Sequence, residues 1–181
     1  MKCPKCQGRD LRPTKIEQDL AVLGCDCCKG SLLPLFQYRQ WAEEHPVEVE
    51  LEEKHRCVVE TDETSKALQC PKCSSLMMKY RISSEAENRV DLCASCYDLW
   101  LDSGEWQLIK QLEMQGMLPS IFSDYWQNNI KEELSEIAYH ARYEAVFGED
   151  YSKLREFKEW LDNIDKKQAV INFLKTPKRN A

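Results

Sequence analysis

The sequence predicts a small, metal-stabilised α+β fold, in which two cysteine-rich modules precede an α-helical C-terminal region. Three observations predict it. The 181 residues contain ten cysteines, eight of these cysteines form four C-x-x-C pairs, and apolar residues recur at helical spacing from Leu118 onward. The chain starts without an apolar signal segment and has no long apolar run, so we expect a cytoplasmic protein without a membrane span. In that compartment thiols bind metals more often than they form disulfides.

The cysteine pairs are spaced as metal ligands. The gap between the first two pairs is 18 residues and the gap between the last two is 19, as in two-knuckle zinc sites. Zinc takes four thiolates in a tetrahedron, and each C-x-x-C turn presents two of them. We therefore predict two tandem four-cysteine zinc ribbons, at 1–40 and 70–116, each binding one Zn²⁺. The eight predicted ligands are Cys3, Cys6, Cys25, Cys28, Cys70, Cys73, Cys93 and Cys96.

Each gap is long enough for a β-hairpin. Residues 16–23 supply a strand-forming run in the first gap, and residues 77–82 and 89–92 supply two in the second. A hairpin between two cysteine knuckles is what a zinc ribbon requires.

A shell of four cysteine sulfurs has no open coordination position, so we interpret both sites as structural and expect no catalytic residues. Two alternatives stay open. Iron also accepts a tetrahedral shell of four sulfurs. The C-x-x-C pairs could instead be redox-active, although no βαβ pattern accompanies them.

Two cysteines fall outside the pairs. Cys27 lies inside the second knuckle, where it could replace a neighbouring ligand, and we interpret it as a spare thiol. Cys57 lies near His45 and His55, but these residues form no recognisable ligand pattern. We expect Cys57 to be a core or strand residue.

The chain contains an internal duplication. Cys70 follows Cys3 by 67 residues and Cys93 follows Cys25 by 68, and both copies open on Cys-Pro-Lys-Cys. The run Cys-x-x-Cys-x-x-x-Trp-Leu-Asp-x-Gly-Glu at 93–105 resembles the zinc-ribbon family named after transcription factor IIB. The likeness is close over 70–106, although Asp98 stands where a glycine is usual; the first copy matches mainly in its cysteines. It implies a small zinc-binding module, and the family name suggests a link to transcription.

The second copy continues into a predicted helix. Trp100 and Leu101 can pack over the zinc knuckle and exclude water from the thiolates. Asp102, followed three residues later by Glu105, resembles a capping box that starts a helix through Gln115.

The segment at 41–69 is acidic, with nine Asp and Glu against three Lys and Arg. We expect a solvated linker, although alternating valines and glutamates at 47–51 could form an edge strand.

The helical end at 117–181 carries three apolar stripes. The first runs from Phe122 to Ala145 and is closed by Gly148, the second spans 154–164, and a short third spans 170–174. Because each ribbon is too small to fold without metal, we expect the ordinary hydrophobic core here.

These features favour a non-enzymatic binding protein that acts as a protein-interaction or regulatory adaptor, with a thiol-based redox sensor or iron protein as the alternative. The net charge of −6 excludes a generic polycation. Nucleic-acid binding is possible but second to a protein partner, because thiolate charge offsets the basic residues of the first ribbon. Those basic residues are Lys2, Lys5, Arg9, Arg12, Lys15 and Lys29. The oligomeric state is not predicted.

Overall fold

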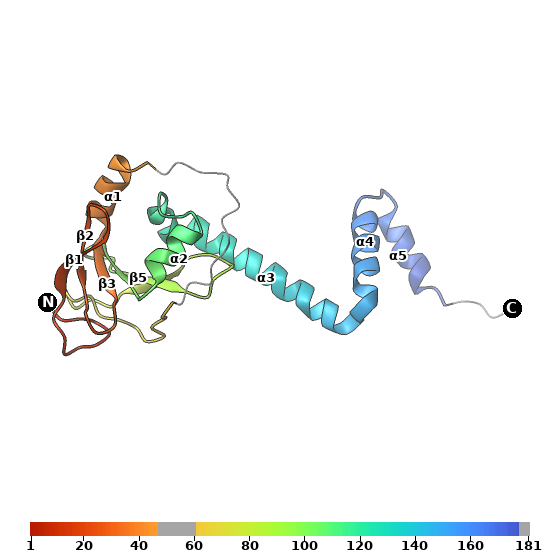
Figure 1. Ribbon diagram of the computed structural model, residues 1–181. Coiled ribbons are helices and arrows are strands. Elements are labelled where there is room, and N and C mark those ends of the chain that lie inside the picture. The colour runs from red at the N-terminus through yellow and green to blue at the C-terminus, as the bar shows by residue number, and fades with distance from the viewer. Residues whose placement is uncertain (47–60, 178–181) are drawn as a thin grey trace. The chain divides into compact units, whose positions relative to one another are not determined.

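The computed structural model describes residues 1–46 and 61–177 (Figure 1). The chain divides into two compact units, 1–133 and 134–181. The first unit contains β1 (Arg12–Glu17), β2 (Leu20–Gly24), β3 (Ser31–Pro34), α1 (Leu35–Glu44), β4 (Met78–Arg81), β5 (Arg89–Leu92), β6 (Asp98–Leu101), α2 (Glu105–Gln111) and the 3₁₀ helix η1 (Leu118–Phe122). Helix α3 (Asp124–Phe147) contains the boundary, and η2 (Gly148–Asp150), α4 (Tyr151–Asp162) and α5 (Lys167–Lys175) follow.

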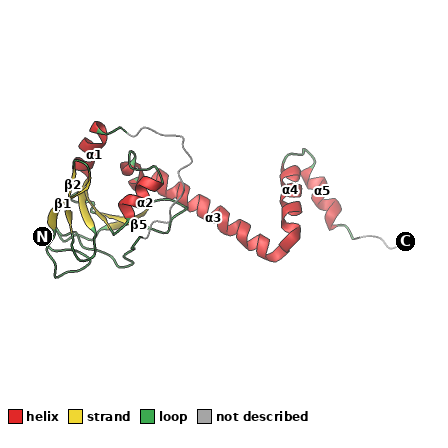
Figure 2. Cartoon of the chain, in the orientation of Figure 1, coloured by secondary structure: helices red, strands yellow, loops and turns green. Residues whose placement is uncertain are grey.

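The six strands form one antiparallel sheet in the order β1-β2-β3-β6-β5-β4. Figure 2 shows its strands in yellow. Each copy of the duplication contributes three consecutive strands, and the two copies meet where β3 pairs with β6. The strand order therefore reads the same from either edge, with each strand of one copy matched by its counterpart in the other.

A local two-fold relation joins the copies. Leu32 pairs directly with Trp100 across the β3–β6 junction, and these two residues are 68 positions apart. That is also the separation of Cys25 from Cys93 and of the cysteines that follow them. Leu32 thus faces its own counterpart, and Ser31 pairs with Leu101 as Leu33 pairs with Leu99, as around the axis of an isologous interface between two identical subunits. The two predicted ribbon segments are halves of one continuous sheet, a junction that the sequence pattern does not predict.

The hydrophobic core lies on this sheet, under α1, α2 and η1. The expectation that the core would form in the helical end is wrong, since no described residue from 134 onward is buried. Joining two three-stranded ribbons creates a wide apolar face, and the helices that follow each ribbon cover it. Tyr38 and Trp41 of α1 and Trp106 of α2 are buried there.

Local boundaries differ from the predicted ones in two places. The predicted run at 16–23 is divided by a turn at 18–19, because Asp19 adopts a positive φ of 61°, which tightens the hairpin. Helix α2 begins after Gly104, at a φ of 84°, and ends at Gln111 rather than at Gln115. The three apolar stripes of the C-terminal end fall on α3, α4 and α5.

The acidic segment is only partly a linker. Its first residues belong to α1, and residues 61–69 are packed against the second ribbon, where Thr64 and Leu68 are buried. The backbone N–H of Asp62 donates to the carbonyl of Ser103 at 2.9 Å. The alternation at 47–51, together with His55 and Cys57, lies outside the described residues. Within the described ranges, no helix combines the length and apolar character needed to cross a membrane.

Candidate metal centres

The first thiol group sits at one end of the sheet's first half. Cys3 and Cys6 lie on a turn before β1, and Cys25 and Cys28 on the turn between β2 and β3. Their four sulfurs all lie within 4.8 Å of one another. The Cys3 Sγ is 3.6 Å from the Cys28 Sγ, and the Cys25 Sγ is 4.0 Å from the Cys6 Sγ.

The second group repeats this arrangement in the second half. Cys70 and Cys73 precede β4, and Cys93 and Cys96 follow β5. These four sulfurs also lie within 4.8 Å of one another, with 3.5 Å between the sulfurs of Cys73 and Cys93. The structure thus brings together each set of four cysteines that the spacing predicted, and Cys27 is exposed and outside the first set.

The sulfur separations fit a metal tetrahedron and not a disulfide. Four sulfurs at the Zn–S distance of about 2.3 Å stand about 3.8 Å apart, and the observed separations are 3.5, 3.6 and 4.0 Å. A disulfide would require about 2.05 Å, and the nine cysteines of the described residues are all free thiols. The two groups can therefore each hold one metal ion.

Backbone amides support the sulfurs. The N–H of Cys6 donates to the Sγ of Cys3 at 3.3 Å, and the N–H of Cys96 donates to the Sγ of Cys93 at 3.4 Å. These donors stabilise negative charge on a buried sulfur. The two bonds lie in the first knuckle of the first copy and in the second knuckle of the second copy, so they follow from the C-x-x-C turn itself rather than from equivalent positions.

The thiols of one group cannot all ionise by themselves. Hydrogen bonds from Ser75 lower the pKa of Cys73 to about 6, and the pKa of Cys96 rises to about 12, chiefly through its hydrogen bond with Cys73. In the first group, burial raises the pKa of Cys3 to about 11. A divalent cation removes this conflict, because it favours the thiolate form of every ligand.

Trp100 links the two thiol groups. Its side chain is fully buried, in one apolar cluster with cysteines of both groups, Cys3, Cys25, Cys70 and Cys93. A Cβ placed on Gly30 would lie 2.3 Å from Cζ2 of Trp100. The Trp100 ring of the second copy thus occupies the space that a side chain at Gly30 of the first copy would need. The packing around one thiol group therefore depends on the packing around the other.

Asp102 anchors Trp100 and neighbouring segments. Its carboxylate accepts hydrogen bonds from Nε1 of Trp100 at 3.0 Å and from the backbone N–H of Thr64 at 2.6 Å. Lys5 of the first ribbon also reaches it, at 3.4 Å. One of the two hydrogen bonds of the predicted capping box is present: the Glu105 carboxyl group accepts a hydrogen bond from the backbone N–H of Asp102 at 2.8 Å. The other is absent, because the Asp102 carboxylate does not cap α2, whose N-cap residue is Gly104.

Two more carboxyl groups are buried beside this network. Burial raises the pKa of Glu105 to about 8, and the nearby charge of Asp102 adds to the effect. Burial also raises the pKa of Asp91 to about 6, against the opposing effect of Lys79 at 2.8 Å. Sequence reasoning missed both groups, since acidic residues are common and nothing in the local pattern marks these as buried.

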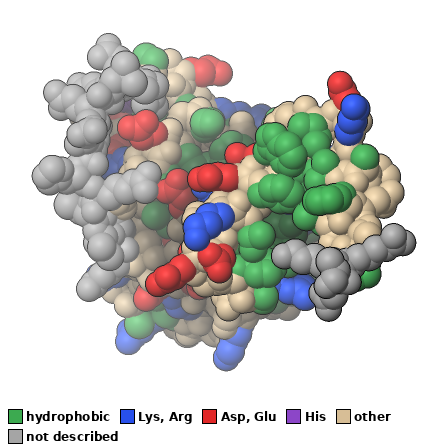
Figure 3. Space-filling model, turned by 90° about the vertical axis from the view of Figure 1, so that its right-hand side faces the viewer, with side chains coloured by type: hydrophobic (Ala, Val, Ile, Leu, Met, Phe, Trp, Pro, Cys, Tyr) green, Lys and Arg blue, Asp and Glu red, His purple; other side chains and the backbone are tan. Residues whose placement is uncertain are grey.

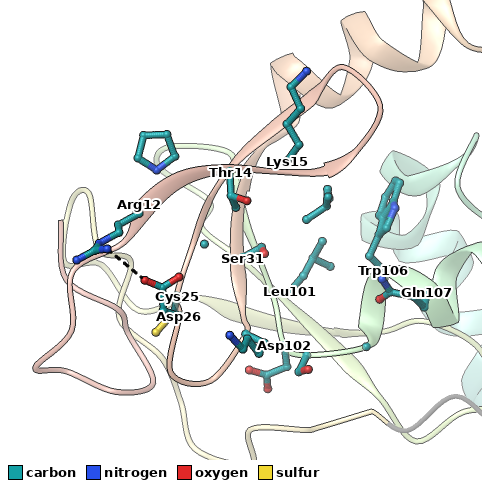
Figure 4. Close-up of a pocket in the computed structure, with 16 residues that line it drawn as sticks. Arg12, Thr14, Lys15, Cys25, Asp26, Ser31, Leu101, Asp102, Trp106 and Gln107 are labelled. Carbon is teal, nitrogen blue, oxygen red and sulfur yellow. Dashed lines mark ion pairs between the residues drawn. The ribbon is translucent and has the colours of Figure 1, made fainter.

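A groove of about 690 Å³ opens between the first ribbon and the start of α2 (Figure 4). Both copies line it: Arg12 and Lys15 come from β1, and Leu101 and Trp106 come from the second copy. It exists because β3 and β6 are paired. Its walls carry charges of both signs.

The basic residues of the first ribbon are largely matched by acids. Four of the six have an acidic partner within 4 Å. The pairs are Lys2–Asp10, Lys5–Asp102, Arg12–Asp26 and Lys15–Asp19. The patch that favoured nucleic acid in the sequence is therefore locally compensated.

Comparison with family models, with curated proteins and with solved structures finds no match to this chain. The resemblance to the transcription-factor-IIB-type ribbons rests on the run at 93–105 and stays a prediction, while the two groups of four cysteines are compatible with zinc ribbons.

Proposed function

We propose that this chain is a non-enzymatic zinc protein, in which two structural Zn²⁺ ions hold together a platform for protein interaction. The eight paired cysteines are the proposed ligands. The observation that carries the proposal is the mutual approach of four sulfurs in each group, to within 4.8 Å. This arrangement supplies the four ligands that a closed structural site requires.

A structural role follows from the chemistry of the shell. Four protein sulfurs leave no position for a metal-bound water, and without that water zinc cannot generate a nucleophile. We choose zinc over iron because zinc has no redox chemistry and the proposed role is structural. The proposal also places the protein in the cytoplasm, where thiols are kept reduced.

Within this proposal the partner is a protein. The acid–base pairs on the first ribbon leave little unpaired positive charge for phosphates, which normally require several free Lys and Arg. The groove beside α2 offers instead a concave surface with both signs of charge, from Arg12, Lys15 and Asp26, while Trp106 and Leu101, which also line it, are only 3% and 1% exposed. A surface with both signs of charge complements the charged and polar side chains of a protein partner better than it complements a polyanion.

The proposal is tested by native and denaturing mass spectrometry of protein purified without chelator or added metal. We expect two zinc ions per chain and ten reduced thiols, with the ligand thiols protected from alkylation and Cys27 reactive. Iron, or disulfides in place of metal, would overturn the assignment.

A redox-sensing role is the second candidate, and the exposure of Cys27 favours it. This thiol lies next to Cys28 and interacts with Cys6. A mild oxidant such as hydrogen peroxide could form a disulfide between Cys27 and a ligand, with release of zinc and reduction of the peroxide to water. Cys27→Ser should then slow peroxide-driven zinc release; equal rates in both proteins would exclude this role for Cys27.

A further inference from the structure

Two features of the described residues are not used by the proposed function. One is the set of exposed apolar side chains on the C-terminal helices, such as Trp160 and Phe173. Figure 3 views the molecule from the side of these helices and shows hydrophobic side chains gathered in one patch, but nothing in the described residues identifies what covers it. The other feature is a difference between the two thiol groups, and this difference indicates how the chain holds its metals.

The two thiol groups differ at one of their four ligands. Three pairs of corresponding cysteines have the same burial in both copies, namely Cys3 with Cys70, Cys25 with Cys93, and Cys28 with Cys96. In the fourth pair, Cys6 of the first copy is partly buried, whereas Cys73 of the second copy is exposed. The second group therefore has one ligand that solutes can reach directly.

The surroundings of Cys6 explain why it is covered. The side chain of Lys5, which precedes it, is only 25% exposed and is held across the junction by buried Asp102 of the second copy, at 3.4 Å. Lys5 also reaches Asp62 at 3.5 Å, and Cys6 itself interacts with Cys27. Contacts from outside its own turn thus close the first knuckle of the first copy.

The corresponding knuckle of the second copy is more open. Lys72 stands where the first copy has Lys5, and its side chain is 52% exposed. Its acidic partner, Asp98 at 3.5 Å, belongs to the same copy. Residues 74–76, which follow Cys73, are all exposed. The same C-x-x-C turn therefore leaves Cys73 at the surface.

Exchange of a metal with the solution begins at a ligand that solutes can reach, because a cysteine sulfur reacts only where it is accessible. At such a ligand the thiolate gives up its bond to the metal and takes a proton from water, and a donor atom of a chelator takes the vacated position. A group without an exposed sulfur must first open locally, which costs free energy. The difference at the fourth ligand thus predicts different exchange rates at the two sites.

We propose that the second thiol group is an exchangeable zinc site and the first a permanent one, with exchange starting at Cys73. The inference rests on the proposed function, because it concerns the two Zn²⁺ ions proposed there. It adds a function to the chain, which keeps one zinc as part of its fold and gives up or takes the other as the free zinc concentration changes.

The test follows zinc release from the full-length chain loaded with two zinc ions. Zinc is transferred to the coloured chelator pyridylazoresorcinol and measured by absorbance. Samples taken during the transfer are alkylated with N-ethylmaleimide, and the modified cysteines are mapped by mass spectrometry. We expect two phases of one zinc each, the first faster by about tenfold or more. Among the ligands, Cys73 should be alkylated first, and the second group before the first.

Matched variants at the two knuckle lysines test the cause. Lys5→Ala removes the side chain that closes the first knuckle, so the rate of the slower phase should rise several-fold. Lys72→Ala makes the same change at the corresponding position of the second copy and should leave the slower phase unchanged. Both variants should contain two zinc ions before the chelator is added.

Release of both zinc ions in a single phase would overturn the inference. Alkylation of the first group before the second would also overturn it, as would a slower phase that both lysine variants change equally. The starting zinc content tests the proposed function separately. A chain whose two zinc ions leave together keeps the proposed function and loses only this inference, whereas a chain purified without zinc loses both.

Discussion

The two copies of the duplication have similar thiol geometry and different surroundings. The first copy places Gly30 and Leu32 after its second knuckle, where the second copy has Asp98 and Trp100. Helix α1 begins after Pro34 without a side-chain cap, whereas Glu105 at the start of α2 bonds back to the backbone of Asp102. The shared thiol geometry thus involves only the eight cysteines, and residues that differ between the copies join one copy to the other.

Neither copy is an independent module, because side-chain contacts and strand pairing join the two. Trp100 is packed against Gly30, and Lys5 of the first copy pairs with buried Asp102 of the second. The β3–β6 pairing makes a single sheet. We therefore expect that a mutation that destabilises one copy also destabilises the other.

The largest effect is expected from losing a ligand of the second copy. Cys70→Ser or Cys96→Ser should release one of two metals and unfold the second ribbon, because three sulfurs no longer close the shell. Through the shared sheet, the remaining metal should also be lost to a chelator more quickly than in the wild type. Metal analysis and chelator-competition rates measure both effects.

Cys27→Ser is the matched control, since it removes an exposed thiol from outside the sulfur group, and it should keep two metals. Retention of both metals in Cys70→Ser and Cys96→Ser would contradict the ligand set. A drop to one metal in Cys27→Ser would show that Cys27 is itself a ligand.

The next largest effect is expected from Trp100→Leu. This substitution gives the second copy the residue that the first copy has at the equivalent position, Leu32. We expect a loss of about 2–4 kcal/mol in the free energy of unfolding, because a large buried side chain is cut back and a cavity remains. Chemical denaturation measures the loss. Both metals should be released faster; faster release from the second site alone would argue against the coupling.

A smaller effect is expected when Glu105 is neutralised. The fold raises the pKa of Glu105 from 4.5 to about 8, so it favours the protonated form. The resulting stabilisation is complete below the unfolded pKa and is lost as pH rises through about 8. The wild type should lose about 2 kcal/mol from this group between pH 6 and pH 8.

Glu105→Gln cannot ionise and keeps an oxygen for the N–H of Asp102, so its stability should change less over this range. Urea unfolding at several pH values gives the difference between the two proteins. Glu87→Gln, at an exposed position, should follow the wild type. Parallel curves for wild type and Glu105→Gln would contradict the buried, protonated carboxyl group.

The smallest change is Gly30→Ala, which adds a single methyl group at the contact between the two copies. The added Cβ meets the buried Trp100 ring at 2.3 Å, so we expect a cost of about 1–3 kcal/mol from overpacking. Gly8→Ala is the control, with its nearest neighbour at 3.8 Å.

In the Trp100→Leu background, the cost of Gly30→Ala should fall to less than half, because the obstructing ring is gone. If Gly30→Ala lowers the free energy of unfolding equally in both backgrounds, as read from denaturation midpoints, then the strain does not come from contact with the Trp100 ring.

The thiol groups could be predicted from sequence because metal coordination depends on local spacing. A C-x-x-C turn places two sulfurs side by side whatever the rest of the chain does, and the hairpin between turns is short. The same locality explains why the helical stripes of α4 and α5 were found.

The junction between ribbons could not be predicted, because it joins distant segments. Strand β3 is four residues long, Ser31–Pro34, and its sequence does not show which edge it meets. Without the junction, the covered apolar face of the sheet could not be anticipated either, so the core was assigned to the helical end. The burial of Asp102 and Glu105 follows from the same contacts and was missed for the same reason.

Zinc-edge X-ray absorption of the full chain tests the central claim most directly, because it counts the atoms that contact the metal. Two closed four-cysteine sites predict an average shell of four sulfurs at about 2.3 Å and no nitrogen or oxygen ligand. A shell with fewer sulfurs and a light atom at about 2.0–2.1 Å would contradict the account, since it would mean that at least one site is open.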